Sequence, residues 1–352
     1  MNMKKSLSVL LALSLMLTVI CGVAPASAEG KKISVVATIF PIYDWVREII
    51  GDDEQAEVTL LLDSGTDLHS YQPTASDILT VSSADLFIYV GGESDEWVED
   101  VRKTAVNANQ KTINLLEALG DAVKTEEIVE GMEHEHDHDE DDDHDEDEDH
   151  DHDDDDHEED HDDDHDDHDH EHEDEADEHV WLSLRNAEKL CGVIAETLGE
   201  IQPESAAKYQ ENLAAYTAKL ADLDAAYKEA VSAAAYKTVL FGDRFPFRYL
   251  VDDYGLDYFA AFSGCSAETE ASFATILFLA QKVDELGLPA VLTIEKADTR
   301  IAQTVVSSTK AGNAKILAMD SMQGTTAKDV QDGVTYLSMM EKNLGVLQEA
   351  LN

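Results

Sequence analysis

The sequence predicts an α/β protein of two lobes with mostly parallel sheets, joined by one long helix. Short apolar, β-branched runs alternate with helical stretches before residue 120 and again after residue 236. Strands that alternate with helices imply parallel sheets covered on both faces. Between the two series, residues 204–236 contain no glycine or proline and are rich in alanine. This composition favours a single helix, which we expect to join the lobes.

The first 28 residues predict a secretory signal peptide. Lys4 and Lys5 precede an apolar run over residues 7–23, and a small-residue triplet ending at Ala28 follows it. This is the pattern of a signal that is cleaved after the triplet. A retained membrane anchor is one alternative, because the run is nearly long enough to span a bilayer; a lipid attached to Cys21 is another. All three predict a protein exported across the cytoplasmic membrane, either periplasmic or at the cell surface.

The first lobe is expected over residues 29–202. It begins with the apolar run ISVVATIFP, and helical spacing follows over residues 43–50. A strand that leads into a helix has this pattern, and the pattern recurs along the lobe. The predicted strands are 33–41, 56–62, 85–91 and 111–115.

The predicted linking helix, residues 203–236, starts at Pro203, and the second lobe follows over residues 237–352. Apolar residues recur three and four positions apart in the helix, as at Leu213, Tyr216 and Leu220. At 1.5 Å per residue the helix would extend roughly 50 Å, which is longer than one small lobe is wide. The predicted strands of the second lobe are 237–242, 256–262, 289–295 and 315–320.

An acidic, histidine-rich block at residues 133–178 interrupts the first lobe. It holds 33 acidic residues, 12 of the 14 histidines and no lysine or arginine. Charge repulsion and the lack of apolar side chains leave such a segment without a core, so we expect a disordered loop. We interpret it as a weak collector or sensor of several zinc ions, with a solvated spacer as the alternative. Its histidines are His134, His136, His138, His144, His150, His152, His157, His161, His165, His168, His170 and His172.

Composition and motifs also exclude some functions. Outside the block, 44 acidic residues face 24 basic ones, so nucleic acid is a poor partner for this surface. The His-Glu-x-x-His motif of zinc hydrolases is absent, and we expect no enzyme. A monomer is expected.

The two histidines outside the block are candidate metal ligands. His69 lies just past the strand 56–62, and His179 opens the helical stretch after the block. In open α/β sheets the ligand binds beyond the carboxyl ends of strands, and neutral imidazole is a preferred zinc ligand. A structural role is the alternative for each of them.

The cysteines Cys191 and Cys265 lie beyond the predicted signal. An oxidising compartment would allow them to pair. A buried small side chain is the alternative for Cys191, which lies in a predicted helix.

Six stretches of the chain carry a resemblance to a known family. In order they are TIFPIYDWV (38–46), GTDLHSYQPTASDI (65–78), ADLFIYVGGESDEWV (84–98), EHVWLSLRNA (178–187), FRYLVDDYGL (247–256) and GVTYLSMMEKNL (333–344). Together they resemble the metal-specific solute-binding proteins of ABC importers, in particular the zinc-uptake branch. The resemblance implies two lobes joined by a rigid helix, with a metal held in the cleft between them and delivered to a membrane permease.

The resemblance also implies a ligand set. His69 matches the family's first ligand, with Leu68 in place of a proline, and His179 matches the second. The third position, five residues before Tyr249, is Arg244, which cannot bind a cation. The neighbouring Asp243 is expected to replace it if the loop is shifted by one residue; a helix cap is the alternative.

Asp320 matches the family's fourth ligand, with a turn or helix cap as its alternative role. Glu295 matches a glutamate that supports the ligands or the fold. Two imidazoles and two carboxylates suit zinc without excluding manganese. The predicted function is therefore zinc capture for an ABC permease; a manganese importer subunit and an extracellular zinc buffer or sensor are the alternatives.

Overall fold

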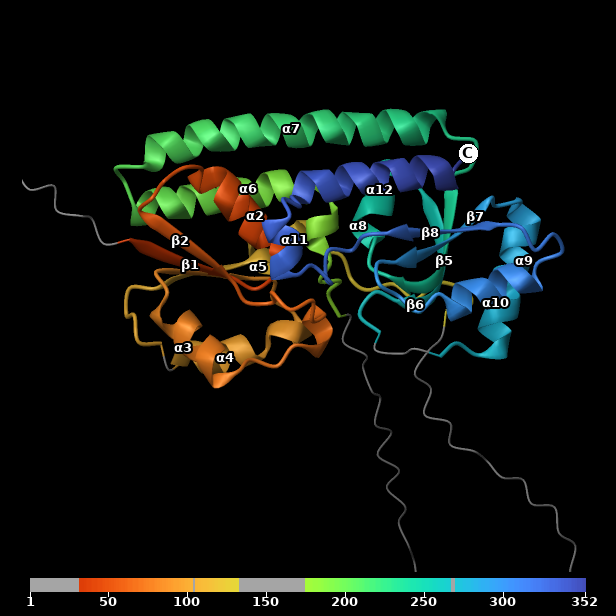
Figure 1. Ribbon diagram of the computed structural model, residues 1–352, viewed down its shortest axis with the longest axis horizontal. Coiled ribbons are helices and arrows are strands. Elements are labelled where there is room, and N and C mark those ends of the chain that lie inside the picture. The colour runs from red at the N-terminus through yellow and green to blue at the C-terminus, as the bar shows by residue number, and fades with distance from the viewer. Residues whose placement is uncertain (1–31, 104, 133–174, 267–269) are drawn as a thin grey trace, which may run out of the picture.

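The computed structural model describes residues 32–103, 105–132, 175–266 and 270–352. Figure 1 shows two α/β lobes side by side, with the helix α7 (Ala206–Ala233) running along both. The predicted signal peptide, Cys21 and the twelve histidines of the acidic block lie outside the described residues. Among the described helices, none combines the length and apolar character needed to cross a bilayer.

In the described part of the chain, each lobe is built on a parallel sheet of four strands. The strand order is β2-β1-β3-β4 in the first lobe and β6-β5-β7-β8 in the second. The predicted fold class is therefore confirmed. The strands are β1 (Ile33–Ala37), β2 (Ala56–Leu60), β3 (Leu86–Tyr89), β4 (Lys111–Asn114), β5 (Thr238–Phe245), β6 (Asp257–Ser263), β7 (Ala290–Ile294) and β8 (Lys315–Met319).

Helices and short turns connect the strands, as parallel pairing requires. In the first lobe they are α2 (Phe40–Ile50), the 3₁₀ turn η1 (Leu68–Ser70), α3 (Ala75–Ser83), α4 (Trp97–Lys103) and α5 (Leu115–Leu119). The 3₁₀ turn η4 (Val180–Leu182) and α6 (Leu184–Ile201) precede α7. The second lobe adds α8 (Arg248–Tyr254), α9 (Phe273–Leu286), α10 (Arg300–Ser308), α11 (Ala327–Gln331) and α12 (Tyr336–Ala350).

The helix α7 is anchored in both lobes. Near its start, the Tyr209 hydroxyl donates to Asp53 Oδ2 of the first lobe at 3.1 Å. Near its end, the Tyr227 hydroxyl donates to the Met340 carbonyl oxygen of α12 at 2.6 Å. At 1.5 Å per residue, its 28 residues extend about 42 Å. One helix thus spans both lobes, over a range slightly shorter than the predicted 203–236.

The strand β5 is longer than the sequence predicts, and this changes the placement of two candidate residues. It continues to Phe245 instead of ending at Gly242, because Arg244 and Phe245 pair with Phe262 and Ser263 of β6 after a register shift. Asp243 and Arg244 therefore belong to the strand and not to the loop after it. Asp243 accepts the Ile294 backbone N–H of β7, whereas Arg244 donates to Asp67 of the first lobe, so the two side chains have different partners.

The lobes are also joined by a continuous apolar core. One cluster of buried side chains contains Trp45 of the first lobe together with Phe241 and Tyr336 of the second. The Tyr336 hydroxyl donates to the Trp181 carbonyl oxygen at 2.7 Å, and the Trp181 indole donates to the Ser321 carbonyl oxygen at 2.9 Å. The two lobes therefore share one cluster of the core.

Candidate metal centre

His69 is presented by the turn η1, beyond the carboxyl end of β2. Asp67 caps this turn, since its Oδ1 accepts the His69 backbone N–H at 3.1 Å. The ring Nδ1 lies 2.8 Å from Ser94 Oγ. A side chain engaged through Nδ1 keeps Nε2 for another partner.

His179 is fully buried at the start of η4. Asp177 Oδ1 accepts both its backbone N–H and its ring Nδ1–H, each at 2.9 Å. Asp177 is held in turn, because its carbonyl oxygen accepts the Tyr249 hydroxyl at 2.8 Å. A carboxylate on Nδ1 fixes the tautomer whose Nε2 is a metal ligand, as second partners do in known metal sites.

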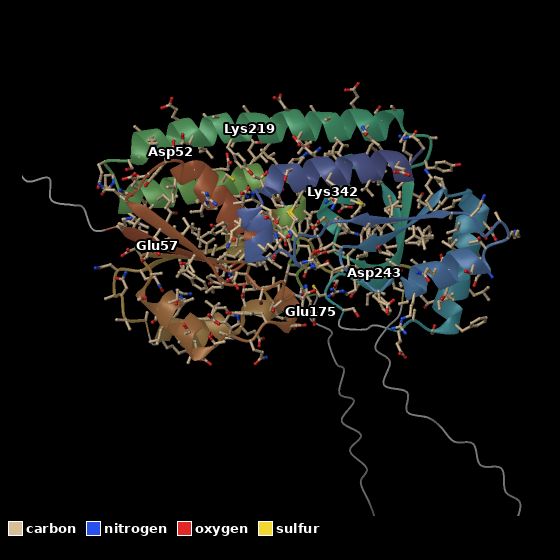
Figure 2. All side chains as sticks on the ribbon, in the orientation of Figure 1. Asp52, Glu57, Glu175, Lys219, Asp243 and Lys342 are labelled. Carbon is tan, nitrogen blue, oxygen red and sulfur yellow. The ribbon has the colours of Figure 1, made fainter. Side chains whose placement is uncertain are left out.

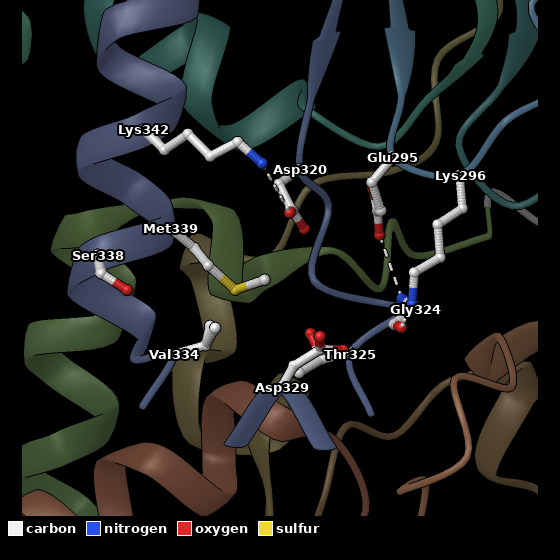
Figure 3. A pocket seen from close by; sticks show the side chains of 10 residues that line it. All are labelled: Glu295, Lys296, Asp320, Gly324, Thr325, Asp329, Val334, Ser338, Met339 and Lys342. Atoms are coloured by element: carbon white, nitrogen blue, oxygen red, sulfur yellow. Dashed lines mark hydrogen bonds and ion pairs between the residues drawn. The ribbon is translucent and has the colours of Figure 1, made fainter. Parts of the chain in front are cut away.

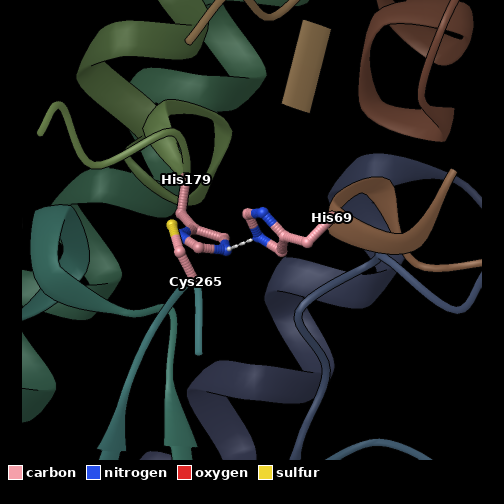
Figure 4. A group of neighbouring side chains, drawn as sticks. All are labelled: His69, His179 and Cys265. Carbon is pink, nitrogen blue, oxygen red and sulfur yellow. Dashed lines mark hydrogen bonds between the residues drawn. The ribbon is translucent and has the colours of Figure 1, made fainter. Parts of the chain in front are cut away.

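The two imidazoles converge between the lobes. Their Nε2 atoms are 3.1 Å apart, and Figure 4 shows the rings facing each other. Two nitrogens bound to one tetrahedral zinc at 2.0–2.1 Å would be about 3.3 Å apart. Sequence analysis predicted both residues as ligands, and the structure brings them to a spacing that one ion can bridge.

The surroundings of His69 keep its ring neutral. Burial, followed by the neighbouring His179, lowers the pKa of His69 to about 3. Neutral imidazole is the form that binds metal. The ring is therefore ready to bind without first losing a proton at neutral pH.

The Glu178 carboxyl group lies next to the His69 ring. Its Oε2 lies 3.6 Å from His69 Nδ1, and its Oε1 accepts the Ser94 backbone N–H at 2.9 Å. Gly92 makes this approach possible, because a Cβ there would lie 2.3 Å from Glu178 Oε1. Burial raises the pKa of Glu178.

Asp177 and Glu178 were predicted as part of a disordered loop, yet both are buried beside the histidines, so the ordered chain begins before His179.

Cys265 is the third member of the cluster, and sequence analysis did not identify it as a ligand. Its sulfur and one ring nitrogen from each of His69 and His179 all lie within 4.8 Å of one another. It follows β6 by two residues, so its position beyond a strand's carboxyl end was a signal that could have found it. Both Cys191, buried in α6, and Cys265 are free thiols.

The structure does not bring Asp243 to the histidines. Its Oδ2 accepts the Ile294 backbone N–H at 3.0 Å, and its Oδ1 accepts that of Arg244 at 2.9 Å. Figure 2 labels it in the second lobe. Arg244 instead pairs with a carboxylate of the first lobe: its Nη2 donates to Asp67 Oδ2 at 2.7 Å. Burial acts to raise the pKa of Asp67, but the Arg244 charge and hydrogen bond outweigh it and lower that pKa.

Asp320 and Glu295 lie in a separate cavity of about 350 Å³, shown in Figure 3. Asp320 Oδ1 accepts the Met322 backbone N–H at 3.0 Å, and its Oδ2 is 3.7 Å from Lys342 Nζ. Glu295 accepts the Ser321 backbone N–H at 2.7 Å and the Ser321 hydroxyl at 2.8 Å. Asp320 is therefore outside the histidine cluster here, and Glu295 bonds to the loop that follows β8.

Zinc-binding proteins are among the proteins that this chain resembles in sequence. The zinc-binding protein AdcA of Streptococcus pyogenes is 28% identical over 321 residues, which are 91% of this chain and 56% of that protein. The zinc-binding lipoprotein AdcA of Streptococcus pneumoniae is 30% identical over 98% of this chain and 61% of its own length. The chain thus spans little more than half of the AdcA proteins. The high-affinity zinc uptake system protein ZnuA of Bacillus subtilis is 29% identical, over 93% of this chain and 90% of that protein.

Solved structures give the same result. The Zn(II)-bound ZnuA-like domain of Streptococcus pneumoniae AdcA matches with a TM-score of 0.64 and 27% identity, covering 91% of this chain and 99% of that domain. A crystal structure of ZnuA, at 19% identity and a TM-score of 0.64, shares the fold. The family model described as "Zinc-uptake complex component A periplasmic" matches residues 35–350. The chain belongs to this ZnuA family.

Proposed function

We propose that this protein captures one zinc ion outside the cytoplasm and delivers it to the permease of an ABC importer. The observation that carries the proposal is the pair His69 and His179, whose Nε2 atoms face each other at 3.1 Å while both Nδ1 atoms are engaged elsewhere. Membership of a zinc-uptake family supports zinc as the cargo and an exported location. The work of the protein is binding and release, with no chemical conversion of the cargo.

The arrangement suits an ion that is held and later released. Ligands that are already oriented before the ion arrives bind it more tightly, because less conformational freedom is lost on binding. His179 is oriented by Asp177 and His69 by Ser94. The three clustered side chains would leave one of zinc's four positions to water, which is the open position typical of sites that exchange a ligand.

The twelve histidines of the acidic block are proposed as weak zinc sites that raise the local supply of the ion. Imidazoles among carboxylates can bind several ions loosely without a folded structure. The ordered pair His69 and His179 supports a distinct, tighter site. We propose that the tight site acts in a monomer.

Calorimetric titration with zinc and with manganese at fixed pH tests the proposal. We expect one tight zinc ion followed by several weak ones, with manganese unable to displace the first. Weak binding alone would favour an extracellular buffer instead. Equal affinity for the two metals would favour the manganese importer subunit.

A further inference from the structure

We propose that the Cys265 thiolate is the third protein ligand of the captured ion and that it makes the site select zinc over manganese. This inference rests on the proposed function and specifies its site. The cluster then has two imidazole nitrogens and one sulfur as donors. Thiolate is a soft ligand that favours zinc, whereas manganese prefers carboxylate and water.

The first argument is the close approach of the Cys265 segment to His179. Gly264 precedes the cysteine, and a Cβ built on it would lie 3.0 Å from His179 Cε1 and 3.1 Å from Nδ1. Contacts this short leave no room for a side chain unless a neighbour moves. The glycine thus lets the backbone pass against the ring, and the sulfur of the next residue lies within 4.8 Å of a ring nitrogen of each histidine.

The second argument is that Arg244 holds the segments of two ligands at once. Its Nη2 donates to Asp67 Oδ2 at 2.7 Å, two residues before His69. Its Nη1 donates to the Ser266 carbonyl oxygen at 3.4 Å, one residue after Cys265. A guanidinium presents several donors in a fixed plane, so it can hold two segments in one geometry. Arg244 occupies the position at which the family resemblance implies a third ligand. It is thus a positioning residue for His69 and Cys265.

The third argument is the charge around the sulfur. Glu126 Oε1 accepts the Cys265 backbone N–H at 2.9 Å, and Asp177 and Glu178 directly precede His179 in the chain. These three carboxylates are the charged groups that act most strongly on this thiol. A dication bound at the sulfur would be stabilised by them. Binding replaces the S–H bond with a zinc–sulfur bond and releases one proton to solvent.

Cobalt(II) at one equivalent, added to the full chain, tests the proposal. A cobalt–thiolate bond gives a charge-transfer band in the near ultraviolet that histidine and carboxylate ligands do not give. We expect the band in the wild type and in Cys191→Ala, the matched control that removes the other described thiol. Cys265→Ser should abolish it, lower zinc affinity by more than roughly tenfold, as for loss of a group that supports a metal, and change manganese affinity less.

Zinc X-ray absorption on the wild type provides a second readout that does not depend on the folding of a variant. We expect one sulfur neighbour at about 2.3 Å. One tightly bound ion with no sulfur neighbour and no charge-transfer band would overturn the role of Cys265 while leaving the proposed function intact. Absence of any tight ion would overturn both.

Discussion

The histidine–cysteine cluster and the cavity around Asp320 both lie beyond carboxyl ends of strands, but they use their polar side chains differently. In the cluster, supporting groups engage the Nδ1 atoms of His69 and His179 and leave the Nε2 atoms facing each other. In the cavity, Asp320 accepts a backbone N–H and lies near Lys342. A carboxylate whose oxygen accepts a hydrogen bond from the backbone of its own loop has fewer lone pairs available to bind an ion. The Nε2 atoms of the cluster are hydrogen-bonded to each other, where an ion could come between them, whereas the Asp320 oxygens are bonded to the backbone or lie near a lysine.

The largest effect is expected from removing either imidazole. His69→Ala or His179→Ala should abolish the tight zinc site, because no other described histidine can replace the lost nitrogen. Calorimetry with residues 133–174 replaced by a Gly/Ser linker measures this without the weak sites. In the intact chain, His152→Ala is the matched control and should keep the tight site. Wild-type affinity in both cluster variants would place the ion elsewhere.

The next largest effect distinguishes the roles of Asp243 and Arg244, which are neighbours in β5. Arg244→Ala should weaken zinc binding by roughly ten- to a hundredfold, the range typical for residues that hold metal ligands in place. Asp243→Ala should cost about 1–3 kcal/mol of folding stability instead, since it leaves the Ile294 N–H unsatisfied. Zinc titrations and denaturant unfolding of the two variants separate these outcomes. Loss of affinity confined to Asp243→Ala would restore the aspartate as a ligand.

Asp320→Asn tests the cavity side of the comparison. It should lower zinc affinity less than His179→Ala, because the described Asp320 carboxylate serves Met322 and Lys342. Lys342→Met is the matched variant, because it removes the charge that lies near the Asp320 carboxylate. A loss as large as that of the histidine variant would mean that Asp320 leaves the lysine and joins the ion.

Asp44 is expected to affect the pH dependence of folding stability and not the affinity for zinc. Burial raises its pKa to about 6, above the ordinary 3.8. The folded state therefore holds this proton more tightly than the unfolded state does. The resulting stability, about 3 kcal/mol, is fully present below pH 3.8 and is lost as pH rises through about 6. Asp44→Asn should remove this dependence in thermal melts across that window and leave zinc affinity unchanged; an unaltered pH profile would exclude Asp44 as its source.

The smallest effect on the tight site is expected from replacing the acidic block, residues 133–174, with a short Gly/Ser linker. One tight zinc ion should remain and most weak ions should disappear. The replacement must stop before Glu175, whose carbonyl oxygen accepts the Glu126 N–H at 2.7 Å. In the intact chain, weak-site occupancy should fall between pH 7.5 and 5.5 as imidazoles with pKa near 6.5 protonate. Loss of the tight ion would put a primary ligand inside the block.

Most of the fold followed from local patterns. The predicted strands all appear in the described residues, because β-branched apolar runs between helical stretches are a short-range signal. His69 and His179 were also predictable, since histidine is nearly absent outside the acidic block. Their chemical identity, together with the position of His69 beyond a strand, was enough to make these two residues candidates.

The remaining features depend on contacts between distant segments. Cys265 follows a strand, but its membership of the histidine cluster depends on the close approach to His179 that Gly264 permits. Arg244 and Asp243 lie in β5 because of pairing with β6, which no local pattern reports. Composition likewise could not distinguish the buried Asp177 from the acidic residues of the preceding block.

The apolar core that runs through both lobes has a consequence for cooperativity and for exchange of the ion. The apolar cluster that the lobes share, with α7 along both of them, couples their stability, so we expect one unfolding transition. Separating the lobes as rigid bodies would expose this core. We therefore expect entry and exit of the ion to require less free energy by local opening. The turn that carries His69 and the segment that carries Cys265 would move while the rest of both lobes stays folded.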